Sequence, residues 1–75
     1  MSEKQVSIQS EYITLDAFLK WAGVADTGGH AKTLISEGLI KVNGEVELRR
    51  GRKLRPGDSV LAEGFPPYVI SSEGA

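Results

Sequence analysis

Apolar residues recur with helical spacing in two stretches of the first half of the chain. In the first stretch, four apolar side chains fall at positions i, i+3, i+4 and i+7, which predicts one apolar helix face. These residues are Leu15, Phe18, Leu19 and Ala22. Thr14 is placed to cap the start of this helix, and Gly23 is placed to end it in a left-handed conformation. Val24 would then fold back onto the last turn.

The second stretch predicts another helix, which follows the first closely. Its apolar stripe consists of Ala31, Leu34 and Ile35. Asp26 or Thr27 can cap its start, and Gly38 ends it. Since only a short connection separates the two helices, we expect them to pack as a tight pair.

Alternating apolar and polar residues, which are typical of half-buried strands, mark the rest of the chain. Val6 and Ile8 alternate with polar residues, and with residues 12–13 they predict a short strand or extended arm ahead of the first helix. After the second helix, short apolar stretches predict strands at residues 39–42, 46–48, 59–62 and 68–70.

Turn signals and prolines indicate how these strands are arranged. Asn43-Gly44 predicts a hairpin turn, and Pro56-Gly57-Asp58 predicts a second turn. Pro66 and Pro67 cannot donate ladder hydrogen bonds, so we expect the last strand at the margin of the sheet. The sequence therefore predicts an α+β domain, with two packed helices against a small antiparallel sheet of short strands.

Length and composition set the scale of this domain. The 75 residues have room for one domain and one small core, which we place at about residues 6–70, with frayed tails at 1–5 and 71–75. Without cysteine the chain can form neither a disulfide nor a thiolate metal site. No apolar stretch approaches the roughly 20 residues of a membrane span, and we expect a cytoplasmic protein.

Positive charge is concentrated in one short segment of a chain whose formal net charge is −1. Residues 41–55 hold six basic and two acidic side chains, a balance of +4, whereas residues 1–40 balance at −2 and residues 56–75 at −3. The centre of this segment is Arg49-Arg50-Gly51-Arg52-Lys53-Leu54-Arg55. The asymmetry favours a site for an anionic partner, with nucleic acid as the leading candidate, and a solvated charged loop as the open alternative.

The predicted start of the second helix, residues 26–32, is another candidate anion site. A helix N-terminus presents unpaired amide donors and the positive end of the dipole. Gly28 and Gly29 would leave those amides open to a phosphate, and Lys32 would add a cation one turn further on. A glycine inside a helix destabilises it by roughly 0.8–1 kcal/mol relative to alanine. Two glycines in a row are therefore unfavourable here unless the backbone geometry or a ligand requires them. The alternative is an ordinary capped helix start with two loose glycines.

The remaining candidates show no catalytic pattern. His30 is the only histidine, and we expect it to face solvent or RNA. Trp21 is expected to pack in the core, whereas Tyr12 and Tyr68 either pack or stack on an unpaired base. The sequence contains no P-loop, metal-ligand cluster or nucleophile–base pair, so we expect no enzyme, no cofactor and no metal.

In order and spacing, residues 14–61 resemble the S-four (S4) RNA-binding domain, or αL motif. The matching stretches are residues 13–19, Gly23, residues 27–35, Gly38, residues 42–44 and residues 53–58. The resemblance is closest to the small stand-alone members, the ribosome-associated YbcJ-like and YaaA-like proteins. Many members carry arginine where Thr14 stands and Ser-Arg where Thr27-Gly28 stands, so here the basic loop would carry more of the electrostatics.

The resemblance implies a basic groove for structured RNA, formed by the helix pair and the loop after the hairpin. The candidate RNA-binding residues are Thr27, Gly28, Gly29, His30, Lys32, Lys41, Arg49, Arg50, Arg52, Lys53 and Arg55. We expect the loop and the helix entrance to share one electropositive surface. The expected partner is ribosomal or transfer RNA, free or on the ribosome, bound by a monomer that needs no membrane and no small-molecule cofactor. The alternatives are a protein-interaction module that keeps the fold, and an enzyme or enzyme fragment.

Overall fold

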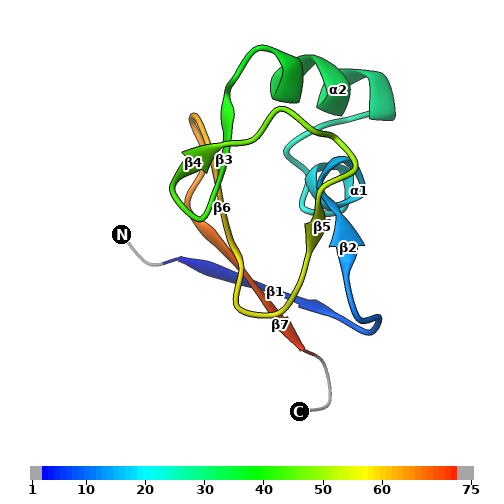
Figure 1. Ribbon diagram of the computed structural model, residues 1–75, viewed down its shortest axis with the longest axis vertical. Coiled ribbons are helices and arrows are strands. Elements are labelled where there is room, and N and C mark those ends of the chain that lie inside the picture. Colours follow the sequence, from blue (N-terminus) through cyan, green and yellow to red (C-terminus); the bar gives the residue numbers. More distant parts are fainter. Residues whose placement is uncertain (1–2, 73–75) are drawn as a thin grey trace.

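A mixed five-stranded sheet, a two-residue strand pair and two helices make up the computed structural model, which describes residues 3–72 (Figure 1). The helices are α1 (Leu15–Trp21) and α2 (Gly28–Ser36). The strands are β1 (Lys4–Ile8), β2 (Ile13–Thr14), β3 (Ile40–Val42), β4 (Glu45–Val46), β5 (Lys53–Leu54), β6 (Ser59–Ala62) and β7 (Tyr68–Ser72). The predicted α+β class is confirmed.

Both helices end as their glycines predict. Gly23 and Gly38 adopt positive φ angles of 81° and 76°. After α1, the Val24 amide donates to the Leu19 carbonyl at 2.9 Å, and after α2 the Leu39 amide donates to the Leu34 carbonyl at 3.2 Å. These six-to-one bonds complete Schellman motifs, which stop each helix and turn the chain back toward the core.

The large sheet has the strand order β1-β7-β6-β3-β4. The β3–β4, β3–β6 and β6–β7 pairs are antiparallel as predicted, but β1 pairs with β7 in parallel. The expectation that the last strand lies at the margin is therefore wrong, because β7 lies between β1 and β6. Pro66 and Pro67 precede β7, so the strand keeps its amides, and the Pro67 carbonyl accepts from the Lys4 amide at 2.8 Å.

The ordered part of the chain extends further than the composition suggests. Lys4 pairs with Tyr68 and Ile8 pairs with Ser72 in the β1–β7 ladder. Residues 4–5 and 71–72, which we predicted to be frayed, therefore belong to strands. Residues 1–2 and 73–75 of the predicted tails lie outside the described residues.

The core fills the space between the helices and one face of the sheet. Phe18 from α1 is fully buried and meets Tyr68 from β7 edge-on, with ring centroids 5.6 Å apart. Tyr68 is thus a core residue. Along β6, Val60 and Ala62 are buried whereas Leu61 faces outward, the alternation expected of a sheet covered on one face.

Several large apolar side chains lie outside this core, among them Trp21, Val46 and Leu48. Trp21 is 63% exposed, so the expectation that it packs in the core is wrong. At 3.6 residues per turn it lies about a third of a turn from the middle of the apolar face of α1. Val46 and Leu48 are also exposed, and Glu47 between them is buried.

Candidate nucleic-acid interface

The basic loop, residues 47–52, connects β4 to β5 and is fastened to the start of α1. The carbonyls of Arg52 and Arg50 accept from the amides of Leu15 and Asp16 at 2.8 and 3.0 Å. These are the first two amides of α1, and they need partners from outside the helix. Thr14 occupies the N-cap position, but its hydroxyl donates to the Asp16 carboxylate at 2.7 Å instead of capping the helix. The predicted side-chain cap is therefore replaced by the backbone of the loop.

Glu47 organises the arginines of this loop. Its Oε2 accepts from the Arg49 backbone amide and from Arg49 Nε, both at 3.0 Å. Its Oε1 accepts from Arg52 Nη1 at 2.7 Å and from Arg49 Nη2 at 3.4 Å. The hydrogen bonds from Arg49 lower the pKa of Glu47 from its ordinary 4.5 to about 2, opposed by burial and helped by Arg52.

These ion pairs leave the guanidinium groups accessible. The Arg49 side chain is 75% exposed and that of Arg52 is 33% exposed. Arg50, Lys53 and Arg55 are exposed and form no ion pair with any residue between 3 and 72. The loop borders a shallow surface hollow lined by Arg49, Gly51, Arg52, Lys53 and Arg55.

Tyr12 adds an aromatic ring to this basic surface. Lys53 Nζ lies 5.0 Å and Arg55 Cζ lies 5.9 Å from the centre of its ring, both within the range of a cation–π interaction. The contact follows from the small β2–β5 pair, in which Ile13 is opposite Leu54 and Thr14 is opposite Lys53. Tyr12 is more than a third exposed, so part of its ring remains open to solvent.

The entrance of α2 holds the second group of candidate residues. Thr27 caps the helix, accepting from the His30 amide at 3.0 Å, while His30 Nδ1 accepts from the Asp26 amide at 3.2 Å. Gly28 and Gly29 lie in the first turn, and a Cβ at either position would meet no atom closer than 3.8 Å. Packing therefore does not require these glycines. Lys32 is exposed.

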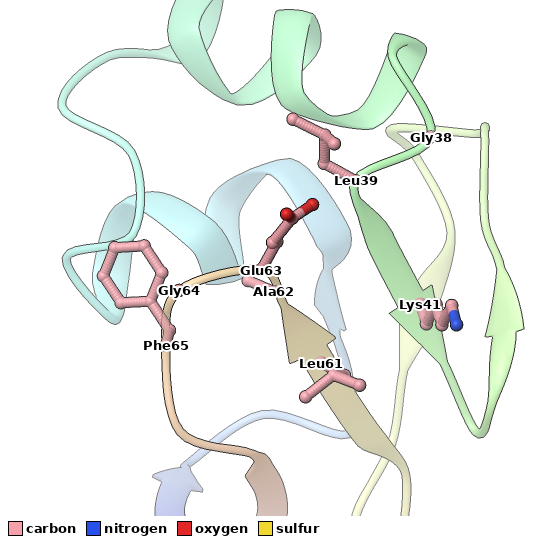
Figure 2. A pocket seen from close by; sticks show the side chains of 8 residues that line it. All are labelled: Gly38, Leu39, Lys41, Leu61, Ala62, Glu63, Gly64 and Phe65. Carbon is pink, nitrogen blue, oxygen red and sulfur yellow. The ribbon is translucent and has the colours of Figure 1, made fainter.

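The candidate residues fall into three groups: the cations of residues 49–55, the α2 entrance and Lys41. Within residues 3–72, no hydrogen bond or ion pair links the α2 entrance to the basic loop. Lys41 lies on the outer face of the sheet, where it is opposite Val46 on β4 and Leu61 on β6. Figure 2 shows Lys41 in a hollow that it shares with Leu61 and Phe65. Cations of residues 49–55 line one surface hollow, and neither Lys41 nor a residue of the α2 entrance lines it.

Sequence reasoning missed Glu47 and the place of Tyr12. The only local signal for Glu47 was an acidic residue two positions before an arginine-rich run. Its inward orientation follows from the β3–β4 register, which puts Glu47 opposite the buried Ile40, and the Glu47 amide donates to the Ile40 carbonyl at 3.0 Å. Tyr12 meets Lys53 and Arg55 only because two distant segments pair as β2 and β5.

No group of three or more His, Cys, Asp or Glu side chains is placed to hold a metal ion in the part of the chain that the structure describes. Neither helix within residues 3–72 is long and apolar enough to cross a membrane.

Comparison with known proteins identifies the family. A family model described as an S4 domain matches residues 6–70. The chain belongs to the S4 domain family. It is 49% identical over 65 residues to "Probable ribosome maturation protein RlbA" of Bacillus subtilis, covering 87% of this chain and 92% of that protein. It is 35% identical over 60 residues to "Putative RNA-binding protein YbcJ" of Escherichia coli, covering 80% and 86%. The S4 resemblance inferred from the residues is thereby confirmed.

Proposed function

We propose that this S4 domain protein is a non-catalytic RNA-binding protein whose basic loop contacts the phosphates of structured RNA. The observation that carries the proposal is the cluster of cations on the basic loop and the three residues after it, where backbone hydrogen bonds to α1 hold the loop in place. Arg49, Arg50, Arg52, Lys53 and Arg55 contribute the charge. A guanidinium group binds phosphate through two parallel hydrogen bonds, which suits this composition.

The loop favours recognition by shape. Phosphate contacts position a protein on nucleic acid but carry little sequence information directly. Duplex RNA has a deep, narrow major groove that side chains do not read, so its backbone is the accessible target. The α2 entrance, with Thr27, Gly28, Gly29, His30 and Lys32, offers a second phosphate contact, and Lys41 a third, when the RNA extends beyond the loop.

The relatives supply the biological setting of the proposal. One is named for ribosome maturation and another for RNA binding. We therefore take ribosomal RNA as the first target to test and transfer RNA as the second, in the cytoplasm. No reaction is assigned to the protein.

A salt titration of RNA binding tests the proposal. Four or five phosphate contacts give a log-log slope of affinity against salt of about −3 to −4. Arg50→Ala combined with Lys53→Ala removes two cations that form no ion pair with a described residue and should weaken binding to all structured RNAs alike. Lys4→Ala combined with Lys20→Ala is the matched control, since it removes the same charge elsewhere. A flat salt response, absent binding, or equal losses in both variants would refute the loop as the RNA site.

One observation favours a second candidate function, assembly through protein contacts. Val46, Leu61 and Phe65 are large apolar residues with 41–50% of their surface exposed. Val46 and Leu61 are opposite Lys41 in the sheet, and Leu61 and Phe65 line the same hollow as Lys41 (Figure 2). Association with ribosomal particles that survives RNase treatment and is lost in Leu61→Glu would support this function over RNA binding. Loss of association with RNase alone would argue against it.

A further inference from the structure

We infer that Glu47 is a positioning residue for RNA binding, which holds the Arg49 and Arg52 guanidinium groups in a fixed arrangement facing the RNA. The inference rests on the proposed function. It goes beyond the charge of the loop, because it assigns a role in binding a polyanion to a residue of the same charge as the RNA.

The geometry of the contacts carries the inference. The carboxylate receives four hydrogen bonds, three from guanidinium nitrogens and one from the Arg49 amide. Glu47 is the one buried charged residue among residues 3–72, although Val46 and Leu48 beside it are exposed. A carboxylate is costly to bury unless its partners satisfy it, so the loop is folded around this group.

The arginines keep most of their donors for a ligand. A guanidinium group has five N–H donors, and Glu47 uses two from Arg49 and one from Arg52. The remaining donors can still reach phosphate oxygens. The Arg49 side chain is 75% exposed, so its ion pair with Glu47 fixes the guanidinium group without removing it from solvent.

Holding the side chains in advance should strengthen binding. A long flexible side chain loses rotamer freedom when a ligand immobilises it, and preorganisation removes part of that cost. The Glu47 charge acts in the opposite direction, because it repels phosphate. Its loss raises the charge balance of residues 41–55 from +4 to +5. Preorganisation predicts that a substitution of Glu47 weakens RNA binding, whereas the loss of its charge predicts that the same substitution strengthens it.

The substitution Glu47→Gln distinguishes preorganisation of the arginines from repulsion of the phosphates, and Glu45→Gln is the matched control. Both variants remove one negative charge within the basic segment, but Glu45 is exposed and forms no ion pair with the described part of the chain. We expect Glu45→Gln to bind structured RNA as tightly as the wild type or slightly more tightly. We expect Glu47→Gln to bind about five- to tenfold more weakly, since two arginines must then be ordered on binding.

A second measurement shows that the loss comes from the arginines and not from unfolding. In nuclear magnetic resonance spectra of the free protein, the Arg49 Nε–H should exchange slowly in the wild type and in Glu45→Gln, and rapidly in Glu47→Gln. Binding is compared at a temperature at which circular dichroism shows all three proteins folded. If Glu47→Gln is not folded at any usable temperature, Arg49→Lys takes its place, since lysine keeps the charge but cannot form the fork.

Each outcome decides a different question. If the wild type binds structured RNA and folded Glu47→Gln binds equally or more tightly, the positioning role is wrong and the proposed function stands. Equal binding by Arg49→Lys and wild type overturns the positioning role in the same way. If the wild type binds no structured RNA, the proposed function itself fails and the inference with it. Weaker binding by Glu47→Gln with unchanged or tighter binding by Glu45→Gln supports the inference.

Discussion

The ion pairs of Glu47 predict how the stability of the protein responds to acid. The pKa of Glu47 is lowered from 4.5 to about 2 in the folded protein, chiefly by hydrogen bonds from Arg49. A carboxyl group with a lowered pKa stabilises the fold above its unfolded-state pKa and loses this contribution as the pH falls through the folded-state value. The contribution of Glu47 should therefore be complete above about pH 4.5 and absent below about pH 2.

The size of this contribution follows from the same shift. At 1.36 kcal/mol per pKa unit, the lowering corresponds to an upper limit of about 3 kcal/mol. Solvent screens an ion pair with an exposed partner, and the Arg49 side chain is 75% exposed. We therefore expect about 1–2 kcal/mol.

Urea unfolding of wild type and Glu47→Gln at a series of pH values measures the effect. At about pH 7 the wild type should be more stable by at least about 1–2 kcal/mol, and the difference should shrink by most of that amount when the pH reaches about 2.5. Glu45→Gln is the control and should follow the wild-type curve. A difference between wild type and Glu47→Gln that stays constant from neutral to acid pH would refute the reasoning.

Substitutions at three further places test the fold and the site. Phe18→Ala should destabilise the protein by about 3–5 kcal/mol in thermal unfolding, because the side chain is fully buried against Tyr68; a loss below about 1 kcal/mol would contradict the assigned core. Gly28→Ala with Gly29→Ala should raise stability by up to about 1 kcal/mol per site, since a Cβ fits at both. The same pair should weaken RNA binding if phosphate approaches the amides, and unchanged affinity would remove the α2 entrance from the site. Tyr12→Leu should weaken binding to RNA with an unpaired base by about tenfold and leave binding to plain duplex nearly unchanged, whereas Tyr12→Phe should behave as wild type; equal losses on both RNAs would rule out stacking.

The sequence by itself determined the local elements of this protein. The spacing of Leu15, Phe18 and Leu19 identified the buried face of α1, and all three are fully buried. Gly23 and Gly38 marked the helix ends because positive φ angles favour glycine. Such features depend on residues within a few positions of one another, and the chain order of helices and turns was therefore predictable.

The concentration of positive charge was also predictable from the sequence, but the ion pairs that its arginines form were not. Five cations in a row of seven fixed the electrostatics of residues 49–55, wherever the loop might lie. Which arginines form ion pairs depended on the inward position of Glu47, which the β3–β4 register sets. The alternation of apolar Val46 and Leu48 in the sequence predicts the opposite orientation.

Tertiary structure alone decided the contacts between distant segments. The parallel β1–β7 pair joins the two ends of the described chain and makes β7 an inner strand. The β2–β5 pair brings Tyr12 to the loop, and Trp21 lies outside because the apolar face of α1 fills the core without it. Periodicity reports which side of an element is apolar, whereas the neighbour that covers that side is chosen by the packing of the whole chain.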